Sequence, residues 1–193
     1  MFGLLCGLLG GFWLDREQTQ LADRVIRFHV IANSDSPEDQ ALKLQVRDRV
    51  LAETETFYPE RATLEEARAA LEAHLEELAA AGQAAVTEAG RSEPVTARLE
   101  RCWFPTKEYD GFALPAGEYT ALRVVIGEGQ GQNWWCVAFP PLCLGAASET
   151  VDTAAQAGYF SQDQVKLVTG ESEGYVLKFK GMELLGQLEA FFS

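Results

Sequence analysis

The sequence predicts an α+β fold, with a mostly antiparallel sheet of about four or five strands packed with two N-terminal helices and a C-terminal helix. Two helical patterns come first, in residues 36–58 and 63–90, and a third lies in residues 181–192. Segments in which apolar and polar residues alternate are grouped between them. That order favours an α+β arrangement over a doubly wound parallel sheet, in which strands and helices would alternate.

Length, composition and charge limit the classes of function. At 193 residues, with 47% hydrophobic and 23% charged residues, the chain fits one folded domain plus a targeting segment. Sixteen Lys and Arg against 29 Asp and Glu give a formal net charge of −13. This charge repels a phosphate backbone or an anionic lipid surface, so nucleic acid is not an expected partner. We expect residues 21–193 to form a single α+β domain.

Local signals mark the first strand and the first helix. Residues 25–32, VIRFHVIA, are typical of a strand buried on at least one face. Ser36 then serves as N-cap, with Pro37 at the first helical position and acids in the first turn. The helix has an apolar face and carries its basic residues on more exposed sides, the apolar residues being Leu42, Val46 and Val50 and the basic ones Lys43, Arg47 and Arg49.

A second, longer helix is expected between residues 63 and 90. Thr63 and Glu66 form a capping box at its start, and Gly90 is a natural C-terminal stop. Its apolar stripe is made of residues at heptad spacing, Leu64, Leu71, Leu78 and Ala85. His74 borders this stripe, and because no Cys or His lies at ligand spacing from it, we expect no metal site there.

Strands are expected after this helix in residues 95–104, 119–126, 134–139 and 175–179. The glycine-rich segment GEGQGQN, residues 127–133, is followed by a strand. A phosphate-binding loop instead needs Lys and Ser or Thr after its last glycine, and a dinucleotide fingerprint needs a helix start. We therefore interpret the segment as a flexible hairpin connection whose glycines supply positive φ angles, and we expect no nucleotide cofactor.

Cys136 and Cys143 allow more than one interpretation. A symmetric hairpin centred between Phe139 and Pro140 would place Cys136 opposite Cys143, close enough for a disulfide if the chain is exported. In the cytosol both cysteines would instead be small buried apolar residues. A nucleophilic cysteine would need His29 or His74 beside it as a base. No catalytic set stands out, so we do not expect an enzyme.

Trp134 and Trp135 are candidates for recognition of another protein. Adjacent residues of a strand face opposite sides, so one should pack inward while the other is exposed beside the glycine-rich loop. Exposed Trp is a favoured anchor in protein interfaces. The alternative, that other parts of the chain cover both rings, stays open.

The N-terminal segment MFGLLCGLLGGFWL, residues 1–14, is uncharged and similar to the apolar region of an export signal. It is shorter than the ~20 residues of a membrane-spanning helix. We expect residues 1–20 to act as an export signal or a membrane-proximal tether. The alternative is an apolar segment that is buried or docked on a partner.

Two long segments carry a resemblance to a known family. They are IRFHVIANSDSPEDQALKLQVRDRVL, residues 26–51, and GFALPAGEYTALRVVIGEGQGQNWWCVAFPPLC, residues 111–143, with a weaker match in YVLKFKGMELL, residues 175–185. The sequence resembles the stage II sporulation protein R family of endospore-forming bacteria. The resemblance implies a signalling protein without enzymatic activity, made in the forespore and exported into the space between the two membranes. There it would activate a membrane-embedded aspartic protease of the mother cell, which processes an inactive sigma factor precursor.

We expect the contacts with the extracytoplasmic part of that protease to come from loops on the rigid scaffold, where binding usually resides. The candidates are Asn33, Ser34, Asp35 and Ser36 in the turn after the first strand, and Trp134, Trp135, Phe139 and Pro140 further on. Two other functions stay open. One is a cell-envelope hydrolase with Cys136 or Cys143 as nucleophile, and the other is an envelope structural module without a signalling partner.

Overall fold

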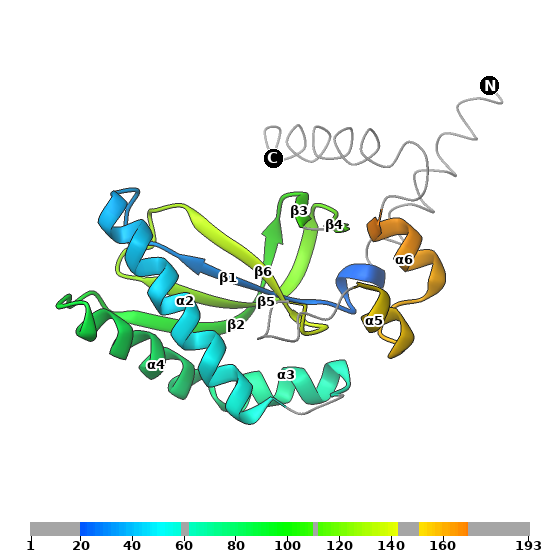
Figure 1. Cartoon of the computed structure of the whole chain (residues 1–193), viewed down its shortest axis with the longest axis horizontal. Coiled ribbons are helices and arrows are strands. Elements are labelled where there is room, and N and C mark those ends of the chain that lie inside the picture. Colours follow the sequence, from blue (N-terminus) through cyan, green and yellow to red (C-terminus); the bar gives the residue numbers. More distant parts are fainter. Residues whose placement is uncertain (1–19, 59–61, 110–111, 143–150, 170–193) are drawn as a thin grey trace, which may run out of the picture. The chain divides into compact units, whose positions relative to one another are not determined.

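The computed structural model describes residues 20–58, 62–109, 112–142 and 151–169 (Figure 1). These residues divide into two compact units. The sheet unit contains residues 25–58, 62–101 and 120–142, and the second unit contains residues 20–24, 102–109, 112–119 and 151–169. Residues 1–19 of the expected export segment, which was predicted as residues 1–20, and the expected C-terminal strand and helix lie outside the described residues.

A mostly antiparallel four-stranded sheet forms the sheet unit, as the sequence predicts. Its order is β2 (Val95–Phe104), β5 (Gly117–Ile126), β1 (Ile26–Ile31) and β6 (Asn133–Phe139). β1 lies between β5 and β6, parallel to the first and antiparallel to the second. The expected hairpin between β5 and β6 is therefore wrong, because the glycine-rich loop connects two strands that are separated by β1.

The first of the predicted helices, α2 (Pro37–Phe57), begins as expected. Ser36 is its N-cap and accepts a hydrogen bond from the backbone N–H of Asp39, and Pro37 is the first helical residue. The buried face repeats at intervals of three or four residues and consists of Asp39, Leu42, Lys43, Val46, Val50 and Thr54. The expected exposure of Lys43 is wrong, because its ammonium group reaches the main-chain oxygen of Gln132 at 2.9 Å.

The long helix expected in residues 63–90 is two helices, α3 (Leu64–Ala73) and α4 (Leu75–Glu88). The predicted capping box of Thr63 and Glu66 is present at the start of α3. His74 interrupts the helix with φ −115° and ψ 21°. Its ring stacks on Phe57 with 4.0 Å between the ring centroids, and its Nδ1 lies 2.8 Å from the Ala70 carbonyl oxygen. The heptad pattern continues through this break and so gives no sign of it.

Helices α2 and α4 lie side by side against one face of the sheet (Figure 1). Gly82 of α4 permits the close approach of this helix to β2 and α2, since a Cβ atom there would lie 2.9 Å from Cγ1 of Val95 in β2 and 3.2 Å from Cγ1 of Val46 in α2. The largest fully buried apolar side chains of the sheet unit come from α3, α4 and the sheet, and they include Phe28, Ile26, Leu71, Leu78, Leu122 and Ile126. Burial of such side chains is the main favourable term in the stability of this unit.

The second unit contains a short antiparallel pair, β3 (Lys107–Tyr109) and β4 (Phe112–Leu114), and two short helices, α5 (Val151–Gln156) and α6 (Gln162–Thr169). The hydroxyl of Tyr119 donates to the Pro115 carbonyl oxygen at 2.7 Å, and its ring meets Phe104 edge-on. The sequence predicted only a turn-rich loop between β2 and β5. The β3–β4 pair is too short to produce a clear alternating pattern.

Candidate functional site

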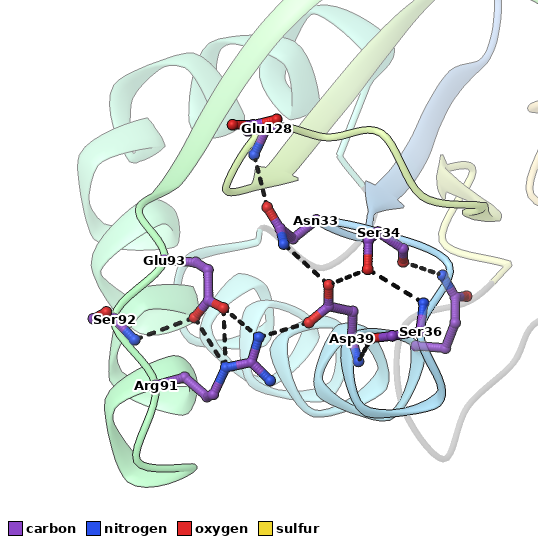
Figure 2. A network of polar contacts seen from close by, with 9 residues as sticks. Asn33, Ser34, Ser36, Asp39, Arg91, Ser92, Glu93 and Glu128 are labelled. Carbon is purple, nitrogen blue, oxygen red and sulfur yellow. Dashed lines mark hydrogen bonds and ion pairs between the residues drawn. The ribbon is translucent and has the colours of Figure 1, made fainter.

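The turn between β1 and α2, residues 33–36, uses its side chains to hold itself in place (Figure 2). Nδ2 of Asn33 donates to Oδ2 of Asp39 at 3.0 Å, and the hydroxyl of Ser34 donates to the same oxygen at 2.6 Å. Oγ of Ser36 accepts from the backbone N–H of Asp39 at 3.1 Å. Three of the residues predicted to contact a partner are thus bonded to one buried aspartate.

Asp39 is the charged centre of this network (Figure 2). Its side chain is 5% exposed, and its second oxygen, Oδ1, accepts from Nη2 of Arg91 at 2.7 Å. Hydrogen bonds from Ser34 and Asn33, with a smaller effect of Arg91, lower the pKa of Asp39 to about 2. The carboxylate is therefore ionised throughout the neutral range, which suits a structural anion and not a group that transfers protons.

Arg91 belongs to the segment between α4 and β2 and joins that segment to the network. Its guanidinium group also pairs with Glu93, two residues further on. Hydrogen bonds with Glu93 and Asp39 raise the pKa of Arg91, and the Arg91 contact lowers the pKa of Glu93. A cation shared between two carboxylates fixes the start of β2 relative to the start of α2.

The glycine-rich loop, residues 127–132, is bonded to the same turn. Oδ1 of Asn33 accepts from the backbone N–H of Glu128 at 3.0 Å, and Oδ1 of Asp35 accepts from that of Gln132 at 2.7 Å. The backbone N–H of Gly131 donates to the Ala32 carbonyl oxygen at 2.9 Å. The turn and the loop therefore form one hydrogen-bonded unit at the end of β1.

Two glycines of this loop are required because the loop lies very close to the β1–α2 turn. At Gly127, where φ is +58°, a Cβ atom would lie 2.2 Å from Oδ1 of Asn33. At Gly131 it would lie 2.2 Å from the main-chain oxygen of Ser34. The prediction of positive φ is confirmed at Gly127 and Gly129. The glycines serve to let the loop cross the β1–α2 turn at backbone contact distance.

Trp134 lies on the face of the sheet that carries α2. Its ring meets Phe28 edge-on at 5.6 Å between centroids, and the guanidinium carbon of Arg47 lies 5.0 Å from the ring centroid. The ring is half-buried. Because Arg47 belongs to α2, this cation–π contact ties the helix to β6 at a point that stays partly accessible to solvent.

Trp135 lies on the opposite face, as the alternation of a strand predicts. It stacks on His29 with centroids 5.2 Å apart and is also half-buried. His29 is 5% exposed, and burial, assisted by Arg123 and Arg27, lowers its pKa to about 4. His29 is therefore neutral at pH 7. The expected contrast of one buried and one exposed tryptophan is not observed, since each ring rests on a core residue.

Phe139 and Pro140 are both buried, and the peptide bond between them is cis. Next to them, the hydroxyl of Tyr58 donates to the Ala138 carbonyl oxygen at 3.0 Å. Of the predicted contact residues beyond the turn, Trp134 and Trp135 thus present accessible side-chain surface, whereas Phe139 and Pro140 belong to the interior.

Cys136 is disulfide-bonded and 6% exposed. Cys143, its predicted partner, lies outside the described residues, so the pairing stays a prediction. A sulfur in a disulfide has no thiolate with which to attack a substrate. In this state Cys136 cannot act as the nucleophile of the alternative hydrolase.

Within the described ranges, no group of three or more His, Cys, Asp or Glu side chains is arranged to hold a metal ion. In the same part of the chain, no helix has the length and apolar character needed to cross a bilayer.

Three structural roles were not predicted from the sequence. Asp39 and Arg91 hold the β1–α2 turn in place, and Arg47 contacts the Trp134 ring. Asp39 was recognised only as an acid in the first turn of a helix. Its partner Arg91 is 52 positions away in the chain, and Arg47 and Trp134 are 87 positions apart. Such pairs leave no periodic signal in one sequence.

Comparison with known proteins places the chain in a class. The model of the family "Stage II sporulation protein R (spore_II_R)" matches residues 22–149. The stage II sporulation protein R of Bacillus subtilis (strain 168) is 38% identical over 153 residues, which cover 75% of this chain and 67% of the relative. No solved structure matches the chain. The chain thus has a role in sporulation. It belongs to the stage II sporulation protein R family.

Proposed function

We propose that this chain is a sporulation signal that is secreted from the forespore into the intermembrane space and activates a membrane-embedded aspartic protease there. The activated protease then processes an inactive mother-cell sigma factor precursor. The family match over residues 22–149 is the observation that carries the proposal. The apolar segment of residues 1–14 supports export or tethering to a membrane.

The geometry of the sheet unit suits a protein that binds another protein. A rigid sheet carries Trp134 and Trp135 on its two faces, each fixed against a buried residue of β1. Rigid, half-exposed aromatic side chains lose little conformational entropy on binding and contribute large contact areas.

Activation requires that the signal bind the active state of the protease more tightly than the inactive state. To move the protease from about 1% to about 99% active, the ratio of the two affinities must reach about 10⁴. A folded domain that contacts the protease over a standard protein interface can supply a difference of this size.

A deletion strain tests the proposal. Cells that lack the protein should accumulate the unprocessed sigma factor precursor, and expression in the forespore alone should restore processing. A form without residues 1–20 should fold but fail to restore processing, because it stays in the cytoplasm. Normal processing in the deletion strain would refute the proposal.

A further inference from the structure

Three side-chain contacts connect helix α2 and Tyr58, which follows it, with strand β6 and Gln132, which precedes it. Nζ of Lys43 donates to the main-chain oxygen of Gln132 at 2.9 Å, and the Tyr58 hydroxyl donates to that of Ala138 at 3.0 Å. Between them, the Arg47 guanidinium carbon lies 5.0 Å from the centroid of the Trp134 ring. From the first contact to the last, the helix advances about 22 Å and the strand about 20 Å, so the two elements run in the same direction.

Four side chains along this line form a partly exposed surface, which we call the α2–β6 seam: Leu44, Arg47 and Leu51 of α2 and Trp134 of β6. The three helical residues are spaced three and four positions apart and so share one side of α2. Leu44 is 40% exposed, which makes it one of the two large hydrophobic residues classed as exposed in the described part of the chain. Arg47, Leu51 and Trp134 are half-buried.

The seam contains a cation, Arg47, in a chain that is acidic overall. The chain carries a formal net charge of −13, and the surface of α3 and α4 is acidic, with Glu65, Glu66, Glu72, Glu76, Glu77 and Glu88. Arg47 is a cation held in a fixed position by the Trp134 ring. Its Nε and Nη2 atoms both lie 2.7 Å from Oδ1 of the neighbouring Asp48, whose side chain is 65% exposed. An exposed pair of adjacent residues contributes little, so a carboxylate from another protein can join or displace Asp48.

The other candidate surfaces are engaged within the chain. The side chains of Asn33, Ser34 and Ser36 are bonded to Asp39, and Asp35 is bonded to the glycine-rich loop. Trp135 stacks on His29 on the other face of the sheet. The seam instead combines Trp, Arg and Leu, of which Trp and Arg are the residue types that dominate binding energy at protein interfaces.

We infer that the α2–β6 seam binds an acidic, apolar segment of the partner protein, with an apolar side chain placed between Leu44 and Leu51 and a carboxylate placed on Arg47. This inference rests on the proposed function, because the partner is the extracytoplasmic part of the protease named there. The contact then lies on the side of α2 that carries Leu44, Arg47 and Leu51, and on the Trp134 ring.

Binding of the full chain to the purified extracytoplasmic part of the protease tests the inference. Arg47→Glu should weaken binding at least about tenfold and Leu44→Glu by a similar factor. Arg98→Glu is the matched control, since Arg98 is an exposed arginine on β2, and it should change the affinity less than about twofold. The Arg47 contribution should also shrink at high salt. Thermal unfolding of each variant shows whether the fold is retained.

The outcomes separate the two proposals. If the wild-type chain binds and the folded Arg47→Glu and Leu44→Glu variants bind equally well, the seam is not the binding surface and the proposed function stands. If the wild-type chain does not bind, the proposed function fails and the seam inference fails with it.

A photo-crosslinking residue at position 44 identifies the occupant of the seam. An adduct with the protease supports the inference. An adduct with a second copy of the chain, or with another part of the same chain, overturns it.

Discussion

Oδ1 of Asn33 accepts a hydrogen bond from the backbone N–H of Glu128, 3.0 Å away and 95 positions later in the chain. The residue before Glu128 is Gly127, and a Cβ atom there would lie 2.2 Å from the same oxygen. The bond that joins the β1–α2 turn to the glycine-rich loop therefore depends on the absence of a side chain at position 127.

Replacement of Gly127 by Ala should break this junction. We expect a loss of about 2 kcal/mol in the free energy of unfolding beyond the cost of the positive φ angle, because Asn33 must move and leave a backbone N–H without its acceptor. Gly90→Ala is the control, since Gly90 also has positive φ, +73°, but no atom lies within 4 Å of its added Cβ. Urea unfolding of both variants measures the difference. Equal losses would contradict the role of Asn33.

Asp39→Asn should be among the more damaging isosteric changes in the sheet unit. Asn33, Ser34 and Arg91 all donate to the Asp39 carboxylate, and an amide presents a donor in place of one acceptor oxygen. We expect a loss of about 3 kcal/mol. Asp48→Asn, at an exposed pair, should cost less than about 1 kcal/mol. Comparable losses in chemical denaturation of the two variants would show that the network contributes no special stability.

Acid should destabilise the fold in two successive pH ranges. The pKa of His29 in the folded protein is about 4, below its ordinary 6.5, so the unfolded chain binds more protons between these values. The free energy of unfolding therefore falls as the pH decreases from about 6.5 to 4, by up to about 3 kcal/mol. The pKa of Asp39 is lowered from 3.8 to about 2, so a further loss follows as the pH decreases from about 4 to 2.

Urea unfolding at a series of pH values measures the free energy of unfolding across both ranges. His29→Gln should remove the pH dependence only in the upper range. NMR titration of the His29 ring gives its pKa directly. Arg123→Gln should raise that pKa, because Arg123 lowers it, whereas Arg49→Gln on α2 should leave it unchanged. A His29 pKa near 6.5 in the native protein would show that the ring is not buried as described.

Much of the fold follows from local sequence signals. Ser36 with Pro37, and Thr63 with Glu66, marked helix starts that the structure confirms, because capping uses residues within one turn of each other. β2 was predicted at residues 95–104 from its alternation, and the structure gives the same bounds. The opposite orientations of Trp134 and Trp135 follow from the geometry of any strand.

What could not be predicted depends on contacts between distant parts of the chain. The place of β1 between β5 and β6 arises from pairing of segments about a hundred positions apart. Because β1 separates these two strands, the loop between them crosses the end of β1 and does not form the expected hairpin. Lys43 was expected to be exposed because lysine usually is. Its burial depends on an oxygen of Gln132, 89 positions away. At the break, the His74 ring likewise contacts a distant residue, Phe57 of another helix.

Gly82→Ala should destabilise the protein although alanine favours a helix by about 1 kcal/mol relative to glycine. The added methyl group would lie 2.9 Å from Cγ1 of Val95, and the packed neighbours leave it little room. We expect a net loss of about 1 kcal/mol. The loss in stability of the double variant Gly82→Ala/Val95→Ala should be smaller than the sum of the losses in the two single variants. The reason is that Val95→Ala makes space for the added methyl group. Strict additivity in thermal unfolding would contradict a steric origin.

Trp134→Ala and Trp135→Ala should have different effects. Trp135 covers the buried His29 ring, so its loss should lower stability by about 3 kcal/mol. Trp134 contacts Arg47 at a partly accessible position, so its loss should reduce sigma factor processing in sporulating cells more than it reduces stability. Immunoblots of the precursor and unfolding curves of the purified variants measure the two effects. Loss of the fold in Trp134→Ala would show that this ring is a core residue.

The network around Asp39 also bears on how fast another protein could associate with this end of the sheet. Asn33, Asp35 and Arg91 bind the turn, the crossing loop and the start of β2 to one another without any ligand. A binder that touches these loops meets a shape that already exists and need not wait for them to order. Its encounter rate is then governed by diffusion and orientation, and changes in its affinity appear mainly in the lifetime of the complex.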